Sequence, residues 1–352
     1  MSRVATSLAV QAQFINPLVD PEWDREVASH PNATFFHSSA WARVLAHTYG
    51  HEPFYLRLAT AGQLLALVPV MEVRSRLTGR RGVSLPFTDE CEPLLFGDGT
   101  SELVTDHLRE LARERNWKHF ELRGGTPDAS VTPSVAFYSH TLDLRAGPAR
   151  LFDGFDTSVR RAIRKSERSS LTVEITQTRK SVLDFYHLHI RTRRGHGAPP
   201  QPLSFFLNIY HQIIEPGLGF VVLAHEGARP AAGAVFFQFG TKAIYKFGAS
   251  DESLQELRGN NLVMSQAIRY LTEYRTDTLH FGRTSLANDG LRRFKQSWGA
   301  KEETIKYFKF DLASKTWVAS RDKSSGIHTA LFSRLPLALN RLAGSFLYPH
   351  LD

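Results

Sequence analysis

Cysteine is nearly absent from this 352-residue sequence: Cys91 stands alone, so neither an intrachain disulfide nor a zinc site of several cysteines can form. A lone thiol is typical of a reducing compartment, and we expect the cytoplasm. No apolar run reaches the roughly 20 residues that a membrane-spanning helix needs. The G-x-S-x-G elbow and the P-loop are missing too, and the GLG motif at Gly217 lacks the third glycine of a dinucleotide fingerprint. The sequence therefore does not favour a hydrolase with the G-x-S-x-G elbow, a P-loop nucleotidase or a dinucleotide-dependent enzyme.

Acidic residues are outnumbered: 35 Asp and Glu stand against 43 Lys and Arg, which gives a net charge of +8. This balance favours anionic partners such as nucleotides, nucleic acid, phosphorylated cofactors or a membrane surface, and it does not choose among them. The apolar fraction of 42% is ordinary for a soluble globular protein with large cores. The length suggests two domains.

The chain repeats one pattern of elements. Residues 54–73 and 219–239 each consist of two β-rich runs around a Gly-containing turn, which predicts two hairpins. Residues 101–115 and 260–275 then predict helices, each followed by a strand-like run. We therefore predict an α/β fold of two pseudo-duplicated domains, with mixed β-sheets flanked by helices. The predicted units are residues 1–147, residues 148–318 and a C-terminal tail, residues 319–352.

The richest chemistry lies between His280 and Phe310. An apolar strand is followed by a polar loop with Ser285, Asn288 and Asp289, then by a short predicted helix, Leu291 to Ser297, and by an aromatic-rich strand. This order would gather cations around a crevice at the carboxyl end of a strand, where ligands often bind in α/β sheets. The cations are Arg283, Arg292, Arg293 and Lys295.

Lys295 is the cation that we expect to be fixed in place. Phe294 and Trp298 lie four residues apart on one face of the predicted helix, and both are expected to be core anchors beside Lys295. The alternative for the neighbouring arginines is an ordinary solvated surface.

A second cationic segment runs from Asp156 to Ser170, with Asp156, Thr157 or Ser158 as the helix cap. Arg160, Arg164 and Arg168 fall four apart on one helical face, with Arg161 and Lys165 on the adjoining stripe. The face either is solvated or binds phosphates. Phosphate binding is slightly favoured because Arg191, Arg193 and Arg194 follow soon afterwards. His187 and His189 have no further ligand at metal spacing, so no metal site is expected.

Five stretches of the chain resemble the FemAB-like aminoacyl- and acyltransferases, of the peptidoglycan-bridge and exosortase-associated type. These proteins are built from two tandem GNAT-like (acyl-CoA N-acyltransferase) domains. The last of the five stretches is long and ordered enough to be specific. They are residues 35–50 (FFHSSAWARVLAHTYG), 159–167 (VRRAIRKSE), 186–200 (YHLHIRTRRGHGAPP), 245–250 (YKFGAS) and 281–300 (FGRTSLANDGLRRFKQSWGA).

This resemblance implies roles for particular residues. The pair Phe294 and Lys295 matches the family's catalytic site, with Asp289 as the nearest acid. The family's phosphate-binding basic residues point to Arg194 and, from the first domain, to Arg43. We take as substrate-binding candidates Arg160, Arg161, Arg164, Lys165, Arg191, Arg194, Arg283, Arg43 and Trp298. His280 and Ala162 stand where Asp and Asn are common in the family.

The resemblance also implies an N-acyltransferase that moves an aminoacyl or acyl group to an amine of a nucleotide- or lipid-linked precursor of the cell envelope or of a polysaccharide. No permanently bound cofactor is expected. The donor is aminoacyl-tRNA or acyl-coenzyme A, because Leu257 to Leu262 match the coenzyme A loop only partly. A non-catalytic basic module that binds nucleic acid or anionic lipid is the alternative.

The predicted tail ends in a basic amphipathic segment, residues 331–352, which Pro336 interrupts. It is similar to the end of FemAB-like proteins of exopolysaccharide and exosortase systems. Such a segment could dock on the protein core or lie on the inner face of a membrane.

Overall fold

The computed structural model describes residues 10–97, 99–320 and 329–352, so residues 321–328 of the predicted tail lie outside the described part. The first half carries a meander of short strands with helices packed around it. Its elements are β1 (Gln11–Ile15), α1 (Trp23–Ala28), η1 (Phe35–His37), α2 (Ser39–Tyr49), β2 (Glu52–Pro53), β3 (Tyr55–Thr60), β4 (Gln63–Val68), β5 (Met71–Ser75), β6 (Gly79–Ser84), β7 (Leu94–Leu95), α3 (Thr100–Glu114), β8 (His119–Arg123) and β9 (Val135–Asp143).

The second half repeats the order of hairpin, helix and strand with longer elements. They are α4 (Pro148–Gly154), α5 (Thr157–Glu167), β10 (Leu171–Thr176), α6 (Arg179–Gly195), α7 (Leu203–Ile209), η2 (Tyr210–Ile214), β11 (Gly219–Glu226), β12 (Arg229–Phe239), β13 (Lys242–Ser250), η3 (Glu252–Leu257), α8 (Gly259–Glu273), β14 (Thr278–Ser285), α9 (Asp289–Gln296), β15 (Lys301–Asp311) and β16 (Thr316–Val318). The tail forms α10 (Thr329–Arg334), α11 (Leu337–Leu347) and η4 (Tyr348–His350).

The predicted α/β fold and its internal repeat are confirmed. The two hairpins are β3–β4 and β11–β12, and the helices that follow them are α3 and α8. The predicted strands after these helices are β8 and β14. The helix start at α5 is also as predicted, because the Asp156 carboxylate accepts a hydrogen bond from the backbone N–H of Ser158. Local sequence signals were therefore sufficient for these elements.

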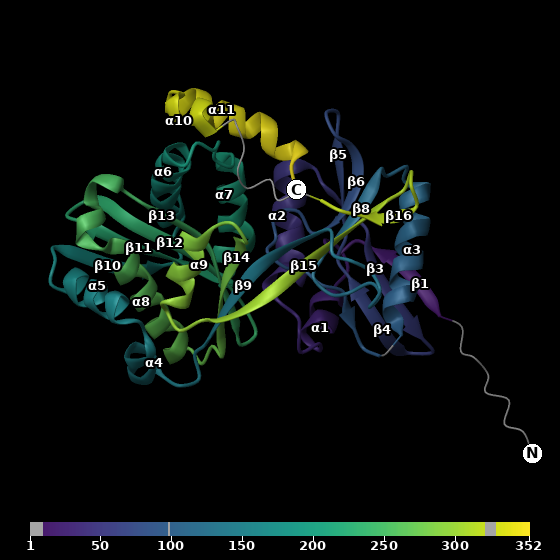
Figure 1. The fold of residues 1–352 in the computed structure, drawn as a ribbon, viewed down its shortest axis with the longest axis horizontal. Coiled ribbons are helices and arrows are strands. Elements are labelled where there is room, and N and C mark those ends of the chain that lie inside the picture. The colour runs from purple at the N-terminus through teal and green to yellow at the C-terminus, as the bar shows by residue number, and fades with distance from the viewer. Residues whose placement is uncertain (1–9, 98, 321–328) are drawn as a thin grey trace, which may run out of the picture.

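The two halves share strands. One four-stranded sheet has the order β1-β3-β4-β7, and a larger one has the order β10-β11-β12-β13-β14-β9-β15-β8-β6-β5-β2. Strand β9, which precedes the predicted junction, pairs with β14 of the second half. Strand β15, from the second half, pairs with β8 of the first. Figure 1 shows β15 running as a long ribbon from one half into the other.

Helices cover both faces of the sheet in the second half. Side chains of β11 alternate between the faces: Val221 and Leu223 pack in one core with Phe185 of α6. Val222 and Ala224 pack in another core with α8, and Ile163 of α5 belongs to that same core. Helix α6 therefore lies on one face of the sheet, and α8 with α5 lies on the other.

Candidate active site

Strands β13 and β14 separate after a short parallel pairing. They pair only from Lys242 to Ile244 on β13 and from Thr278 to His280 on β14, and the pairing of β14 with β9 is irregular between His280 and Arg283. Beyond these points, backbone groups that face the gap have no hydrogen-bond partner on the neighbouring strand. Buried N–H and C=O groups need hydrogen-bond partners from elsewhere. Side chains from both halves supply them, and the result is a polar cluster in the gap between the two strands.

Lys295 supplies the donors for two of these groups. Its Nζ donates to the carbonyl oxygen of Gly282 at 2.6 Å and to that of Arg283 at 3.1 Å. Lys295 is only 2% exposed. Burial lowers its pKa to about 8, although the Asp89 carboxylate opposes the change. An ammonium group has three N–H donors, and the protein uses two of them here.

Asp89 comes from the first half and is the carboxylate of the cluster. Its side chain forms an ion pair with Lys246 Nζ at 2.9 Å and accepts a hydrogen bond from the backbone N–H of Arg283 at 3.2 Å. Burial by itself would raise the pKa of Asp89, but Lys246 and Arg283 hold it well below its usual value. The carboxylate is therefore charged and ties a loop of the first half to β13 and β14 of the second.

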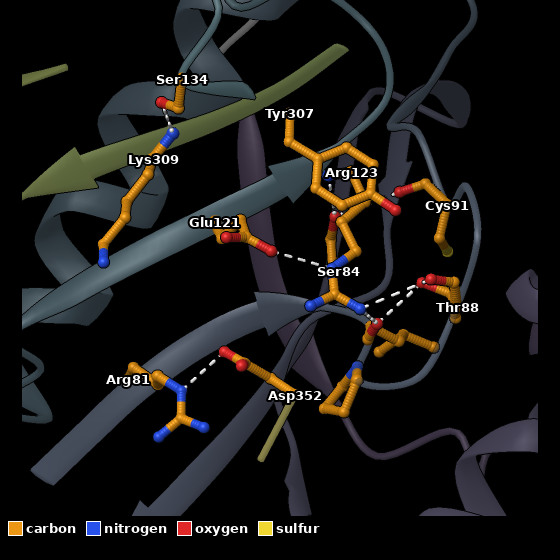
Figure 2. A network of polar contacts seen from close by, with 12 residues as sticks. Arg81, Ser84, Thr88, Cys91, Glu121, Arg123, Ser134, Tyr307, Lys309 and Asp352 are labelled. Carbon is orange, nitrogen blue, oxygen red and sulfur yellow. Dashed lines mark hydrogen bonds and ion pairs between the residues drawn. The ribbon is translucent and has the colours of Figure 1, made fainter. Parts of the chain in front are cut away.

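The loop that carries Asp89 is pinned by a buried arginine. Arg123 Nη1 donates to the carbonyl oxygens of Leu85 and Thr88, at 3.0 and 3.5 Å, and Arg123 Nε donates to Glu121 at 2.9 Å. Figure 2 shows this guanidinium beneath the ring of Tyr307. At the end of the loop, the Tyr307 hydroxyl donates to the backbone carbonyl of Asp89 at 2.6 Å. These contacts hold Asp89 in a defined position.

Arg283 is held by aromatic residues of the neighbouring strands. Its Nη1 donates to the Tyr307 hydroxyl at 2.7 Å, and its guanidinium lies 4.5 Å from the centre of the Phe137 ring. The side chain is half-buried. Together with Lys246 and Lys295 it makes three cations around the ionised carboxylate of Asp89. This excess of positive charge suits an anionic guest.

His280 is neutral at pH 7, because burial lowers its pKa to about 4. Its Nδ1 accepts a hydrogen bond from the backbone N–H of Gly282 at 3.1 Å, so its proton is on Nε2, which lies 2.7 Å from Ser139 Oγ. His280 thus stabilises the bend at Gly282, which has a φ of +74°.

Three residues of this region were missed by sequence reasoning: Asp89, Glu90 and Lys246. Burial, with Glu92 and Glu303 nearby, raises the pKa of Glu90 to about 7, so this carboxyl changes charge near neutral pH. A partial signal was present, because Lys246 lies inside the YKFGAS stretch. No local pattern connects residues 89 and 90 with residues about 160 to 200 positions later in the chain.

The remaining predicted residues of α9 have separate environments. Trp298 is fully buried beside Phe155, and the ring centre of Phe294 lies 6.3 Å from that of Trp298, so the pair anchors α9 as predicted. Lys295 itself, however, is fixed by the two carbonyl groups. Arg292 is paired with both carboxylate oxygens of Glu302 at 2.7 Å, while Asp289 and Arg293 are exposed.

The basic face of α5 lies at the surface. Arg161, Arg164, Lys165 and Arg168, with Ser169, line an open pocket of about 580 Å³. None of these four cations has an ion-pair partner within the described residues. Arg160 is outside the pocket lining, and its guanidinium donates to the Thr157 hydroxyl at 3.3 Å. The predicted face therefore divides, with Arg160 apart from the others.

The later basic residues do not extend this face. Arg191 and Arg194 are on α6, across the sheet from α5, so the two basic stretches cannot hold one phosphate group between them. Arg191 forms an ion pair with Asp251 at 3.7 Å, and Arg194 donates to the carbonyl oxygen of Ser333 at 3.4 Å. Arg43 on α2 donates to Ser39. Closeness in the chain therefore does not favour a joint phosphate site, because the sheet separates α5 from α6.

The described residues hold neither a candidate metal site nor a helix that could span a membrane. No group of three or more His, Cys, Asp or Glu side chains there is arranged to hold a metal ion, and His187 and His189 lie on helix α6. In the same part of the chain, no helix combines the length and the apolar character that crossing a membrane requires.

Comparison with known proteins identifies the second half. Residues 154–296, which include α5, β13, β14 and α9, match the family model "Acetyltransferase (GNAT) domain". No curated protein sequence matches the chain. The match covers the polar cluster except for the residues that the first half and β15 contribute.

Solved structures show that most of the chain has a known fold. FemX aligns with a TM-score of 0.65 at 15% identity, over 84% of this chain and 96% of FemX. A tandem GNAT protein from the clavulanic acid biosynthesis pathway aligns with a TM-score of 0.56 at 10% identity, over 86% and 99%. L-PGS from Bacillus licheniformis aligns with a TM-score of 0.53 at 13% identity, over 90% and 96%.

These identities are low, so the structural matches establish the fold, while the family model establishes the class of the domain. The match to an acetyltransferase domain favours an enzyme over the non-catalytic basic module. The chain therefore has the fold of two GNAT-like halves, and its residues 154–296 match an Acetyltransferase (GNAT) domain.

Proposed function

We propose that the chain transfers an aminoacyl or acyl group to an amine, and that Lys295 stabilises the oxyanion that forms. Attack of an amine on an ester or thioester carbonyl places negative charge on the carbonyl oxygen, and a preorganised cation in a site shielded from water stabilises that charge. Lys295 is buried, is fixed by two backbone carbonyls and retains one N–H donor. The fixed ammonium in the strand gap is the observation that carries this proposal.

Arg283 and Lys246 support the same assignment. With Lys295 they give the gap more positive charge than Asp89 alone can balance, before any substrate is bound. If the carbonyl oxygen of the donor enters between β13 and β14, it would develop its negative charge next to these cations. Holding donor and acceptor together there would supply much of the remaining rate enhancement. Phe294 acts indirectly, because it packs with Trp298 and so keeps α9 in place.

For the donor we propose an anionic carrier, either acyl-coenzyme A or aminoacyl-tRNA. A GNAT domain suggests coenzyme A, whose pyrophosphate would approach the N-terminus of α8 after β13. Gly259, the first residue of α8, is close to Leu171, and Leu171 follows the cationic C-terminal turn of α5. Arg161, Arg164, Lys165 and Arg168 could therefore attract phosphates of either donor toward this end of the molecule.

For the acceptor we propose an amine on a nucleotide- or lipid-linked precursor of the cell envelope or of a polysaccharide. Three neighbours in fold support this class: FemX, L-PGS, and the C-terminal domain of a putative lysylphosphatidylglycerol synthetase from Agrobacterium fabrum. Such acceptors are anionic and suit a protein with a net charge of +8. We place the reaction in the cytoplasm, where both kinds of donor are made.

The test is the rate of a single turnover with Lys295→Met. Methionine keeps most of the aliphatic stem and removes the charge, so the fold should persist. Loss of one such donor typically lowers turnover by about 100- to 1,000-fold, which corresponds to about 3 to 4 kcal/mol. Acetyl-coenzyme A and charged tRNA are offered with amine acceptors, and the donor that wild-type protein consumes is used for the comparison.

Arg293→Met is the matched control. Arg293 lies two residues away on α9 and is exposed, so its loss changes the net charge equally without touching the strand gap. Arg292 is less suitable, because it is paired with Glu302. Turnover of Lys295→Met at the rate of wild type would contradict the assignment, and equal losses in both variants would point to long-range attraction instead.

A further inference from the structure

Helix α11 presents two different faces. Its inner face buries Asn340 and Gly344, and the following residue Tyr348 is buried too. Its outer face carries Leu339, Leu342 and Phe346, which are 51%, 67% and 64% exposed. These three residues are spaced by three and four positions, so they share one stripe of the helix. Large apolar side chains this exposed, on a single stripe, mark an interaction surface.

The inner face is fitted closely to the protein. A side chain at Gly344 would meet the carbonyl oxygen of Pro200 at 1.9 Å, so only glycine allows the helix to approach this far. The hydroxyl of Tyr348 lies 3.3 Å from both the Pro199 carbonyl oxygen and the Arg193 guanidinium. The tail therefore docks on the core, and its outer stripe is held in a fixed position.

The end of the tail adds an anchor in the first half. Asp352 forms an ion pair with Arg81 at 2.7 Å (Figure 2). Arg81 also donates to the carbonyl oxygen of His350 at 2.9 Å. Figure 1 shows α10 and α11 lying along the outer side of α6 and α7. The outer stripe of α11 therefore faces away from the molecule, and within the described residues nothing covers it.

The charged residues within this segment have one sign. Arg334 and Arg341 are exposed, and the sequence has no Asp or Glu between Lys323 and Leu351. Arg194, which donates to the carbonyl oxygen of Ser333, adds a further cation beside α10. An exposed apolar stripe with cations beside it and no acids within the segment matches a helix that lies in the interface of an anionic bilayer.

We propose that the outer stripe of α11, formed by Leu339, Leu342 and Phe346, docks on an anionic lipid surface, with Arg334 of α10 and Arg341 of α11 as the cations beside it. A second copy of the chain is a poorer occupant, because it would bring the same cations against these and carries its own net charge of +8. Docking is independent of the acyl transfer proposed above. It would bring the protein to a lipid-linked acceptor, but either proposal can fail without the other.

The experiment is flotation of the full chain with lipid vesicles. Vesicles of phosphatidylcholine alone are compared with vesicles that also contain phosphatidylglycerol. Wild type should float with the anionic vesicles, and Leu342→Asp combined with Phe346→Asp should lower the partition coefficient by about tenfold or more, because both side chains leave the apolar layer. Arg334→Gln with Arg341→Gln should weaken only the binding to anionic vesicles, by about fivefold for each charge.

Val19→Asp combined with Tyr274→Asp is the matched control. Val19 and Tyr274 are 80% and 65% exposed and lie outside the tail, so the same change in apolarity and charge is made elsewhere. The control should float like wild type, and all variants should keep the wild-type thermal midpoint. Wild-type protein that never floats, or a control that loses flotation equally, would overturn the proposal. A wild-type dimer that the Leu342 and Phe346 variant dissociates would overturn it in favour of self-association.

Discussion

The second half contains two groups of cations that behave differently. On α5, Arg161, Arg164, Lys165 and Arg168 stand in solvent around an open pocket, without ion pairs in the described part of the chain. Between β13 and β14, Lys246, Arg283 and Lys295 are largely removed from water and are held by backbone carbonyls, by aromatic rings and by Asp89.

The difference lies in what burial does to a charge. An exposed cation keeps its hydration and is screened by salt beyond about 10 Å at 0.1 M, so it can attract a polyanion but cannot define one atom's position. A buried cation loses its hydration and must be compensated by fixed groups, which cost stability to assemble. In return it acts at one point and in a low dielectric. We therefore assign capture of the donor to α5 and the chemistry to the strand gap.

Among changes that test this difference between the two groups, removal of the carboxylate that pairs with the buried cations should have the largest effect. Asp89→Asn keeps a hydrogen-bond acceptor for the backbone N–H of Arg283 but leaves Lys246 without its carboxylate. Breaking a buried pair by removing one partner typically costs about 3 to 5 kcal/mol. We expect a loss of that size in the free energy of unfolding, measured by denaturant titration. Asp289→Asn, at an exposed acid, should have little effect, and equal small effects would show that the gap does not depend on this pair.

The protonation of Lys295 gives the next largest effect. Its pKa of about 8 means that the charged form disappears as the pH rises through 8. The ratio of wild-type to Lys295→Met single-turnover rates should fall by about tenfold per pH unit above that value, because titration of the acceptor amine affects both proteins alike. A ratio that stays constant up to pH 10 would contradict the role of the ammonium.

Stability should change in the opposite direction over the same range. The pKa of Lys295 is depressed in the folded protein, so between about pH 8 and 10.4 the unfolded chain binds more protons than the folded one. The contribution of Lys295 to the free energy of unfolding therefore rises with pH in this window. Denaturant titrations of wild type and Lys295→Met at both ends of the window measure it.

The smallest effect is expected on α5. Arg164→Gln with Arg168→Gln should weaken binding of coenzyme A or tRNA, whichever wild type binds, by about three- to tenfold at low salt and hardly at all at high salt. Arg160→Gln is the control, since Arg160 shares the helix and lies outside the pocket lining. Calorimetric titration at two salt concentrations checks this. If Arg160→Gln weakens binding equally, the pocket has no special role.

The sequence alone was enough wherever the cause is local. Hairpins, the capped helix α5 and the short helix α9 follow from turn residues, an Asp cap and apolar spacing, all within a few positions of one another. The burial of Lys295 could also be expected from the sequence. The spacing of Phe294 and Trp298 indicates that this side of α9 faces the core. The proposed limits at residues 147 and 318 rest on signals of the same local kind.

Only the tertiary structure shows which residues far apart in the chain contact one another. Only the exchange of β9 and β15 and the separation of β13 from β14 bring Asp89 beside Lys246 and Lys295, and no periodicity records a contact across about 160 to 200 residues. The same holds for the basic stretches of α5 and α6, which are adjacent in the chain and lie on opposite faces of one sheet. Hydrophobic patterns state that a face is buried, but the packing of the whole chain determines against which partner it is buried.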